Sequence, residues 1–549
     1  MSQQQYRLKV ESADLKNGQK VEAQVEGVDE VKVVLLKVND QLRAIGSNCT
    51  HYGAPLVKGV VADDGRITCP WHGACFNTET GDIENAPALD PIAAYPVTVK
   101  GNDVYITADE ATLKRGSRTP NLACAAKQDS NVLIVGGGSG GIGAIEGLRE
   151  KGYKGKITVL SKEAYLPIDR TKLSKALIPD KEKIQWRDDK FFKDAGVEFH
   201  LETEVDSVDF KDHTVTTKDG RNWNYNKVIF ATGGAPRSLP MEGFKKLGNI
   251  FVLRGIDDVQ RILTQAGEGK KAVVIGASFI GLEVGNCLAG KKNDVTIVGM
   301  ESAPMERVLG DKVGKIIQNK LESAGIKFRL NATIEDAKPK DTDPSKVGSV
   351  QLKGGETIEA DFVVLGVGVA PATEYLKKSG IPLEKDGSVS VDNHWRIEGV
   401  EDAYAVGDIA TYPYAYGAPG DKVRIEHWNV AQNAGRQAAL HIATKRKPTA
   451  FIPIFWSALG AQLRYCGHTS PMSSQYDDVV IHGKPEETKF IAYYTAGDKV
   501  VAVASMQMDP KVMQCAELMR RKKMPSKKEI QDGINVLEIY VPAGVKIEA

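Results

Sequence analysis

Two glycine-rich turns, about 140 residues apart, constrain the fold of this 549-residue chain more than any other feature. The first, Gly136–Gly141, reads G-x-G-x-x-G; it follows an apolar strand that begins at Asn131 and opens a helix that runs to about Lys151. Another apolar strand, Ile157–Leu160, comes next, so the turn lies in the βαβ frame typical of dinucleotide binding. We therefore expect a pyrophosphate on the unpaired amide groups of this helix N-terminus.

Individual positions of the first turn have distinct expected roles. Gly136 permits the tight turn, Gly138 lets the pyrophosphate approach the backbone, and Gly141 allows close packing of helix on strand. The acid that holds the ribose belongs at the end of the second strand, where Lys162 is followed by Glu163. We assign this role to Glu163.

The second turn repeats the arrangement. Gly276–Gly281 follows the strand Ala272–Ile275, opens a helix from Leu282 onward and precedes the strand Val295–Val298. Ser278 replaces the central glycine, which crowds a pyrophosphate slightly but offers a hydroxyl donor. The residues expected to contact this second dinucleotide are Gly276, Ser278, Phe279, Ile280 and Gly281.

Glu301 ends the next strand of this second unit, about 20 residues past Gly281. A carboxylate at that position accepts hydrogen bonds from the adenine ribose and repels a 2′-phosphate, so it favours NADH over NADPH. Arg307 follows six residues later, and its positive charge would attract a 2′-phosphate and so partly undo the preference for NADH.

Two short loops combine cysteine with histidine in an unusual order. Cys49-Thr-His51 and Cys69-Pro-Trp-His72 together supply two thiolates and two imidazoles. Zinc accepts that ligand set, although its spacings usually pair Cys with Cys and His with His. The mixed order favours a [2Fe–2S] cluster in which one iron takes both cysteines and the other both histidines.

Composition excludes several classes of protein. Lys plus Arg number 72 against 71 for Asp plus Glu, a net charge of +1, so we expect no specific nucleic-acid partner. No apolar run approaches the ~20 residues of a transmembrane helix, and seven scattered cysteines do not form a disulfide framework. The first residues of the chain lack an apolar signal and carry Glu11 and Asp14, so we expect a cytoplasmic protein. The alternative is association with mitochondria without a cleaved leader. The chain is compatible with a monomer or a dimer.

The segments Cys49–Leu56 and Cys69–Phe76 closely resemble the ligand loops of the Rieske ferredoxin family over about the first hundred residues. The extra cysteines of high-potential members fall here at Ala54 and Trp71, and the hydroxyl donor near the cluster falls at Ala74. Fewer donors to the cluster sulfurs imply a low reduction potential.

From Asn131 onward the chain resembles the FAD- and NAD-linked reductases with two dinucleotide-binding domains. The resemblance is carried by both turns, by Phe230–Gly234 and Gly366–Pro371, and by Ala405–Asp408, whose aspartate holds the flavin ribityl chain in that superfamily. Asp169–Lys175 narrows it to the ferredoxin-reductase and apoptosis-inducing-factor types. With the N-terminal domain added, the architecture resembles the Rieske-containing apoptosis-inducing-factor-like proteins.

This resemblance implies further site residues. The implied FAD contacts are Gly136, Gly138, Ser139, Gly140, Gly141, Glu163, Arg170, Lys175, Val205, Arg254, Asp408, His427, Trp428 and Trp456. Glu283 and Gly368 border the nicotinamide, Trp456 stacks on cofactor rings, and Lys175 pairs with Glu283 beside the flavin as the catalytic pair.

The resulting fold class is multi-domain: an all-β Rieske domain, α/β FAD and NADH domains, and an α+β C-terminal domain. The expected boundaries are 1–108 for the Rieske domain, 109–130 for a linker, 131–252 with 375–448 for FAD, 253–374 for NADH, and 449–549 for the C-terminal domain.

No closely spaced pair of cysteines follows the first turn, because Cys287, Cys466 and Cys515 lie far apart, so electrons cannot leave the flavin by dithiol exchange. The first hypothesis is therefore an oxidoreductase that passes electrons from NADH through FAD to its own cluster and on to an unknown acceptor. Two alternatives stay open: the reductase component of an oxygenase or cytochrome system, and an apoptosis-related signalling flavoprotein that responds to NADH.

A basic run, Arg520–Lys523 with Lys527 and Lys528, stands near the end of the chain. Because Glu517, Glu529 and Asp532 flank it, we expect a solvated helix end. The alternatives are a nuclear signal and a patch for an acidic partner.

Overall fold

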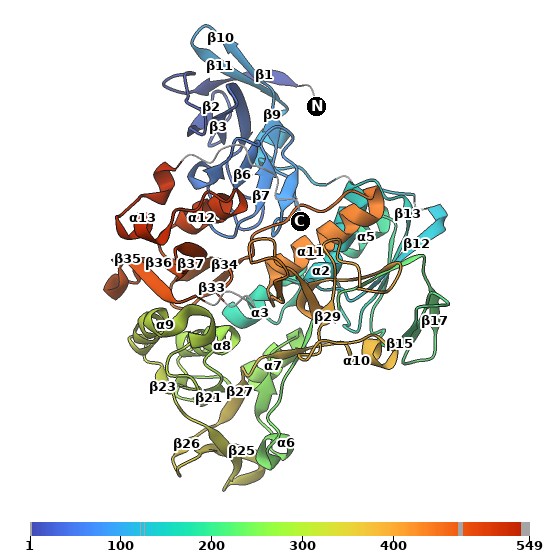
Figure 1. Ribbon diagram of the computed structural model, residues 1–549, viewed down its shortest axis with the longest axis vertical. Coiled ribbons are helices and arrows are strands. Elements are labelled where there is room, and N and C mark those ends of the chain that lie inside the picture. The colour runs from blue at the N-terminus through green and yellow to red at the C-terminus, as the bar shows by residue number, and fades with distance from the viewer. Residues whose placement is uncertain (1–2, 121, 126, 470–475, 540–549) are drawn as a thin grey trace.

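The computed structural model of the protein describes residues 3–120, 122–125, 127–469 and 476–539. The N-terminal strands occupy one end of the long axis and the second dinucleotide-binding unit occupies the other (Figure 1). The C-terminal helix α12 (Lys511–Arg520) lies beside the N-terminal domain, although the two are far apart in sequence, and α13 (Lys527–Gln531) follows it.

The N-terminal domain contains two antiparallel sheets. The seven-stranded sheet has the order β10 (Val97–Lys100), β11 (Asp103–Ala108), β1 (Gln4–Lys9), β2 (Lys20–Val25), β3 (Lys32–Val38), β4 (Gln41–Gly46) and β9 (Ala94–Tyr95). The four-stranded sheet contains β5 (Val60–Val61), β6 (Arg66–Thr68), β7 (Cys75–Asn77) and β8 (Ile83–Asn85). β10 and β11 form a hairpin, because Gly101 takes a φ of 61° and the chain reverses there.

A parallel five-stranded sheet carries the first glycine turn. Its order is β14 (Val197–His200), β13 (Gly155–Leu160), β12 (Lys127–Val135), β18 (Lys227–Phe230) and β30 (Ala403–Ala405). The helices α2 (Ser139–Glu150) and α11 (Trp428–Thr444) cross in close contact, and a Cβ on Gly435 would lie 2.1 Å from the Gly140 carbonyl oxygen. Glycine at this crossing lets two backbones, about 290 residues apart in sequence, meet directly.

The second glycine turn lies in another parallel five-stranded sheet. Its order is β20 (Ile250–Val252), β27 (Phe362–Leu365), β21 (Lys271–Ile275), β22 (Asp294–Val298) and β23 (Lys327–Arg329). The helix α8 (Phe279–Gly290) begins three residues earlier than expected, because the end of the glycine motif already forms its first turn. The expected boundary between the FAD domain and the NADH domain at residue 252 lies too late in the chain. β20, which ends at Val252, pairs with β27 and therefore belongs to this second sheet.

Smaller sheets connect and extend these units. They are β15 (Val205–Asp209), β16 (Thr214–Thr217) and β17 (Asn222–Asn224); β24 (Ile334–Lys340), β25 (Asp343–Leu352) and β26 (Thr357–Glu359); β29 (Val389–Ser390), β31 (Ala410–Pro413) and β32 (Lys422–Val423); and the crossover pair β19 (Gly234–Pro236) and β28 (Val369–Pro371). The remaining α-helices are α3 (Thr171–Lys175), α4 (Lys181–Ile184), α5 (Asp189–Asp194), α6 (Glu242–Lys246), α7 (Ile256–Gln265), α9 (Glu306–Glu322) and α10 (Glu374–Lys378).

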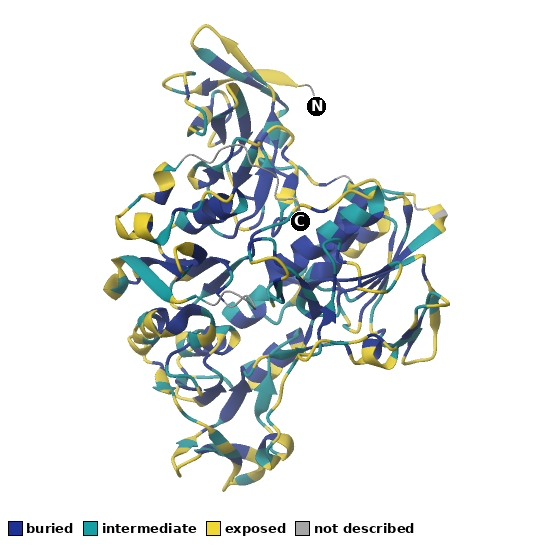
Figure 2. Ribbon diagram, in the orientation of Figure 1, coloured by how far each residue is buried: buried dark blue, intermediate teal, exposed yellow. Residues whose placement is uncertain are grey.

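The C-terminal domain is an antiparallel five-stranded sheet covered by α12. The strand order is β33 (Ile454–Ala458), β34 (Gln462–Gly467), β37 (Lys499–Met506), β36 (Lys489–Ala496) and β35 (Asp478–Lys484). One hydrophobic cluster includes Val60 of the N-terminal domain, Ile134 of the first sheet and Met513 of α12. The buried residues are thus continuous across the domains (Figure 2).

The segment expected to be a bare linker contains regular structure. Glu110–Arg115 forms α1, which begins where Asp109 accepts a hydrogen bond from the Thr112 amide at 2.9 Å. Gly116 ends the helix, and β12 begins at Lys127. The N-terminal domain therefore extends beyond residue 108, because α1 packs onto it through Leu113.

Candidate functional site

The two predicted metal-ligand loops have the same backbone arrangement. In each loop the amide of the cysteine, Cys49 or Cys69, donates to the carbonyl five residues ahead at 2.8 Å. In each loop a glycine four residues ahead, Gly53 or Gly73, donates back to the cysteine carbonyl with φ near 75° (77° and 73°). The loops are equivalent turns that present their side chains to a common point.

The ligand side chains meet at that point. The Nδ1 atoms of His51 and His72 lie 3.0 Å apart, and all four ligand residues are buried. Cys49 and Cys69 lie in the same buried cluster, and hydrogen bonding to Cys69 together with burial raises the pKa of the Cys49 thiol. Two adjacent sulfurs and two converging imidazole nitrogens fit a [2Fe–2S] cluster with Cys49 and Cys69 on one iron and His51 and His72 on the other.

Tyr52 connects the first ligand loop to the predicted flavin region. Its ring stacks on His51 with centroids 3.9 Å apart and an interplanar angle of 12°. Its hydroxyl donates to the Asp169 carboxylate and lies 3.3 Å from Thr171 Oγ1. The Asp169–Lys175 segment, singled out in the sequence as a family motif, therefore contacts the cluster loop.

Trp456 on β33 lies between a cluster ligand and the predicted flavin site. Its ring centroid is 4.4 Å from that of His72, 5.7 Å from that of His51 and 4.7 Å from that of His427. The sequence placed Trp456 among the FAD contacts; the structure shows that it also contacts a metal ligand.

His427 precedes α11 and caps it. The Asn429 amide donates to His427 Nδ1 at 3.3 Å, so the neutral ring carries its proton on Nε2. Burial and the nearby Lys175 lower the pKa of His427 to about 3. Trp428, next in the chain, is buried and donates from Nε1 to Gln432 Oε1 at 3.1 Å.

Lys175 and Glu283 form the predicted ion pair, with 2.9 Å between Nζ and Oε1. Glu283 is buried and also accepts from Ser174 and, at 2.5 Å, from Ser457. The pair thus joins α3 and α8 to β33 of the C-terminal sheet. Ser457 was missed in the sequence, where only its neighbour Trp456 gave a signal.

The first glycine turn has the expected shape for a pyrophosphate. A Cβ on Gly141 would lie 2.2 Å from the Gly136 carbonyl oxygen, whereas a Cβ on Gly138 would meet nothing within 4 Å. Ser139 is the first residue of α2, and Gly140 faces Val406. The free space at Gly138 fits a bound dinucleotide.

Charged residues form two pairs near this turn. Glu163 pairs with Arg170, whose Nη1 also donates to the Arg254 carbonyl oxygen at 2.7 Å. Arg254 lies 3.6 Å from the Asp408 carboxylate. These four predicted FAD contacts are therefore mutual neighbours, whereas Val205, at the start of β15, is buried in the core.

The second turn reproduces the first. A Cβ on Gly281 would lie 2.0 Å from the Gly276 carbonyl oxygen. The Ser278 hydroxyl donates to the Gly366 carbonyl oxygen at 3.0 Å, so this serine connects the turn to the crossover strand. Phe279 packs edge-on against Phe455, with centroids 4.9 Å apart. Ile280 is 41% exposed, and a Cβ on Gly368 would meet nothing within 4 Å.

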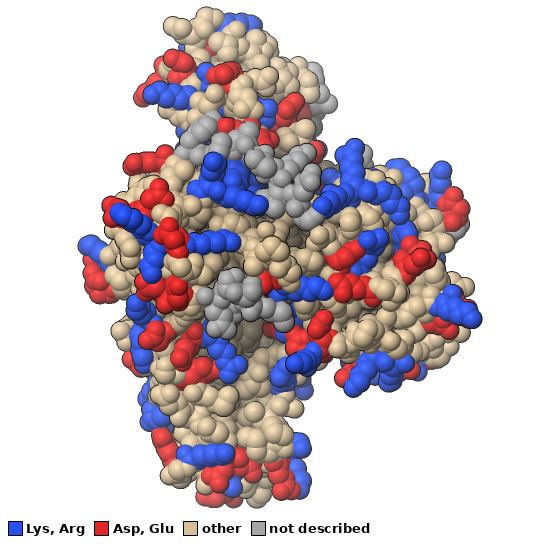
Figure 3. All heavy atoms as spheres, in the orientation of Figure 1, with Lys and Arg blue, Asp and Glu red and all other residues tan. Residues whose placement is uncertain are grey.

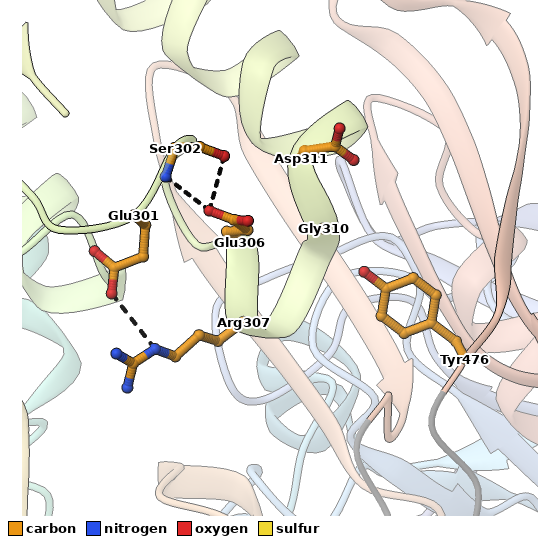
Figure 4. Close-up of a pocket in the computed structure, with 7 residues that line it drawn as sticks. All are labelled: Glu301, Ser302, Glu306, Arg307, Gly310, Asp311 and Tyr476. Atoms are coloured by element: carbon orange, nitrogen blue, oxygen red, sulfur yellow. Dashed lines mark hydrogen bonds and ion pairs between the residues drawn. The ribbon is translucent and has the colours of Figure 1, made fainter. Parts of the chain in front are cut away.

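An open pocket of about 510 Å³ lies where the adenine ribose is expected (Figure 4). Arg307 reaches toward Glu301, with 3.5 Å between Nε and Oε1. The Glu306 carboxylate accepts from the Ser302 amide at 2.7 Å. Asp311 and Tyr476 line the same pocket. Its carboxylates outnumber its one guanidinium, which disfavours an extra phosphate.

One face of α11 holds the N-terminal domain, and nothing in the sequence suggested it. The residues on this face are Asn429, Gln432, Asn433 and Arg436, all buried and spaced three or four apart. Asn429 donates to the His72 carbonyl oxygen at 3.3 Å, and Asn433 accepts from the Ala86 amide at 2.9 Å. The cluster domain is therefore fixed to the helix that His427 caps.

Part of the basic run also holds the N-terminal domain, so its prediction as a solvated helix end is wrong. Arg520 and Arg521 pair with Asp64 at 2.6 and 2.9 Å, and the Arg521 side chain is 1% exposed. Burial opposes ionisation of Glu517, but Arg66, Arg520 and Arg521 outweigh it and lower the Glu517 pKa to about 2. The acidic partner of this run is a domain of the same chain.

One face of the molecule can be compared with this sorted contact. Basic and acidic side chains are interspersed over the face drawn in Figure 3, in keeping with the near-zero net charge. No helix in the described ranges combines the length and apolarity that a membrane crossing requires.

Comparison with known proteins agrees with this geometry. Residues 6–96 match the Rieske [2Fe-2S] domain, residues 130–435 the pyridine nucleotide-disulphide oxidoreductase family, and residues 454–538 the reductase C-terminal domain. Apoptosis-inducing factor 3 of Homo sapiens is 37% identical over 94% of this chain and 84% of its own length. Rubredoxin-NAD(+) reductase of Pseudomonas putida is 31% identical over 66% of this chain and 92% of its own.

A solved complex has the same reductase fold. The covalent putidaredoxin reductase–putidaredoxin complex matches with a TM-score of 0.70 and 25% identity, over 75% of this chain and 98% of that one. Together the matches confirm the predicted fold class and the cofactors FAD, NADH and a Rieske-type [2Fe–2S] cluster, and they remove the zinc alternative.

Proposed function

The chain belongs to the pyridine nucleotide-disulphide oxidoreductase family, and from that premise we propose that it transfers electrons from NADH to the iron–sulfur cluster of its own N-terminal domain. When bound, FAD accepts a hydride from NADH and releases electrons singly, and the cluster accepts them one at a time. The residues of the chain bind these groups, fix their separation and exclude water between them.

One observation carries the proposal. The Trp456 ring contacts both the His72 ring and the His427 ring. His72 is a cluster ligand and His427 a predicted flavin contact, so an aromatic side chain spans the interval between the two redox groups.

The docked domain supports transfer without a large movement. Asn429 and Asn433 on α11 and the Asp64–Arg521 ion pair hold the cluster loops against the reductase. The His51 and His72 rings are covered by Tyr52 and Trp456. A fixed donor and acceptor meet without the diffusional search that separate proteins require.

Lys175 and Glu283 orient the flavin end of the path. The Lys175 ammonium places a positive charge beside the flavin, where it stabilises the reduced ring. Glu283, fixed by Lys175, Ser174 and Ser457, holds that ammonium in position and borders the nicotinamide.

We assign NADH as the donor because Glu301 faces the pocket expected for the adenine ribose. The acceptor beyond the cluster is assigned to the class of redox proteins, because the relatives' names include a rubredoxin reductase and a ferredoxin reductase subunit of an O-demethylase. We place the protein in the cytoplasm, with mitochondrial association as the alternative.

Anaerobic stopped-flow mixing with NADH tests the proposal. Flavin bleaching should be followed by cluster reduction in the same molecule, at a rate independent of protein concentration. A reduced flavin that persists beside an oxidised cluster would contradict the proposal and favour the signalling alternative.

A further inference from the structure

Arg464, which lies outside every predicted site, faces the cluster loops. It is the direct cross-strand partner of Trp456 in the antiparallel pair β33–β34. Directly opposed residues in such a pair project from the same face of the sheet. Because the Trp456 ring contacts the His72 ring, that face is the one that covers the cluster loops.

Gly73 gives the same placement independently. A Cβ on Gly73 would lie 2.8 Å from Ile454 Cδ1, so the residue after His72 lies directly on β33. Ile454 is two residues before Trp456 and therefore shares its face. The second ligand loop rests on the surface to which Arg464 belongs.

The Arg464 guanidinium is buried with incomplete pairing. Its side chain is 4% exposed and lies 3.6 Å from the Asp509 carboxylate, beyond hydrogen-bond distance. Nη1 donates to Gln462 Oε1 at 3.0 Å, but Nε has no hydrogen-bond partner among the described residues. A buried donor without an acceptor costs about 1–3 kcal/mol. A negative group close to the guanidinium would offset this cost.

The carboxylate nearest to Arg464 belongs to Asp509 and compensates the guanidinium only in part. It raises the pKa of Arg464, while burial lowers it. The cluster loops, which pack on the same face of the sheet, are where a further negative charge would meet this guanidinium.

We propose that Arg464, from the C-terminal domain, supplies a positive charge that stabilises the reduced cluster and so raises its reduction potential. Each electron that enters the cluster adds one negative charge, which a buried cation favours. The N-terminal domain itself has Ala74 where a hydroxyl donor is expected in high-potential relatives. The cluster potential is thus set partly by another domain, an inference that rests on the proposed function.

The test is a chemical redox titration of the full-length holoprotein, followed by low-temperature EPR and without NADH. In Arg464→Gln the equilibrium constant for one-electron reduction of the cluster should fall about tenfold, equivalent to ~59 mV. Arg464→Lys, which keeps the charge, should stay within threefold of the wild-type constant. A fall of less than threefold in Arg464→Gln, or an equal fall in both variants, overturns the proposal.

Asp509→Asn supplies a second test should Arg464→Gln not retain its cluster. Removal of the Asp509 carboxylate leaves the positive charge of Arg464 less compensated. The equilibrium constant for one-electron reduction of the cluster should therefore rise by threefold or more, and a smaller change overturns the proposal. Because the reductant is chemical, a failure here is distinct from a failure of electrons from NADH to reach the cluster.

Discussion

The ring centroids of Trp456 and His72 lie 4.4 Å apart, although the two residues belong to the last and first domains of the chain. This contact places a C-terminal tryptophan against a ligand of the N-terminal cluster. In the proposed function, the C-terminal domain is therefore part of the path between the two redox groups.

Replacement of Trp456 by Ala should slow reduction of the cluster by NADH while flavin reduction keeps its rate. The loss of the bridging ring should slow this step by roughly tenfold, about 1.4 kcal/mol in activation free energy. Anaerobic stopped-flow spectroscopy at flavin and cluster wavelengths measures both steps. Trp223→Ala is the control, because this ring on β17 packs against His200, with centroids 4.3 Å apart, rather than against a cluster ligand, so cluster reduction should keep its rate.

Neutralising Glu301 should shift the cofactor preference toward NADPH. In Glu301→Gln the repulsion of a 2′-phosphate disappears and Arg307 is released from its ion pair. The ratio of kcat/KM for NADPH to that for NADH should rise about tenfold, ~1.4 kcal/mol. Adding Arg307→Gln should reverse most of the gain, and an unchanged ratio in Glu301→Gln would show that the pocket does not bind the ribose.

The ion pairs of Glu517 should make stability depend on pH. Its folded pKa of about 2 lies below the ordinary 4.5, so the stabilisation is complete above pH 4.5 and is lost as the pH falls toward 2. Glu517→Gln should therefore lower the free energy of unfolding at pH 7 by on the order of 3 kcal/mol, and the difference from wild type should shrink below pH 4.5.

Chemical denaturation between pH 3 and pH 7 measures this dependence. The exposed Glu335→Gln serves as control and should show a constant, small difference from wild type. A Glu517→Gln difference that does not vary with pH would contradict the assigned pKa.

Replacement of Gly435 by Ala should disturb the crossing of α2 and α11. The added Cβ would lie 2.1 Å from the Gly140 carbonyl oxygen, in the predicted FAD turn, so we expect a loss of about 1–3 kcal/mol and weaker FAD retention. Thermal unfolding and flavin content measure both. Gly290→Ala in α8 is the control, since its Cβ would meet nothing within 4 Å and should stabilise the helix slightly.

The residues that the sequence identified are those whose chemistry depends on local spacing. The cluster ligands lie within four residues of one another in each loop, and each glycine turn directly joins a strand to the following helix. The spacing of residues in the sequence is therefore enough to predict these sites. The Lys175–Glu283 pair followed from the family resemblance.

The residues that the sequence missed depend on packing between domains. Ser457, Asn429 and Arg464 have no local pattern, because their partners are hundreds of residues away or on a neighbouring strand. Arg520 and Arg521 were assigned to solvent because nearby acids flank them in sequence. Their actual partner, Asp64, comes within reach only when the N-terminal and C-terminal domains dock.

Anaerobic titration of the purified holoprotein with NADH, monitored by low-temperature EPR, tests the central claim most directly. We predict that NADH alone, without added ferredoxin, produces the signal of a reduced [2Fe–2S] cluster with mixed sulfur and nitrogen ligands. A fully reduced flavin with no cluster signal at any NADH concentration would contradict electron transfer within the chain.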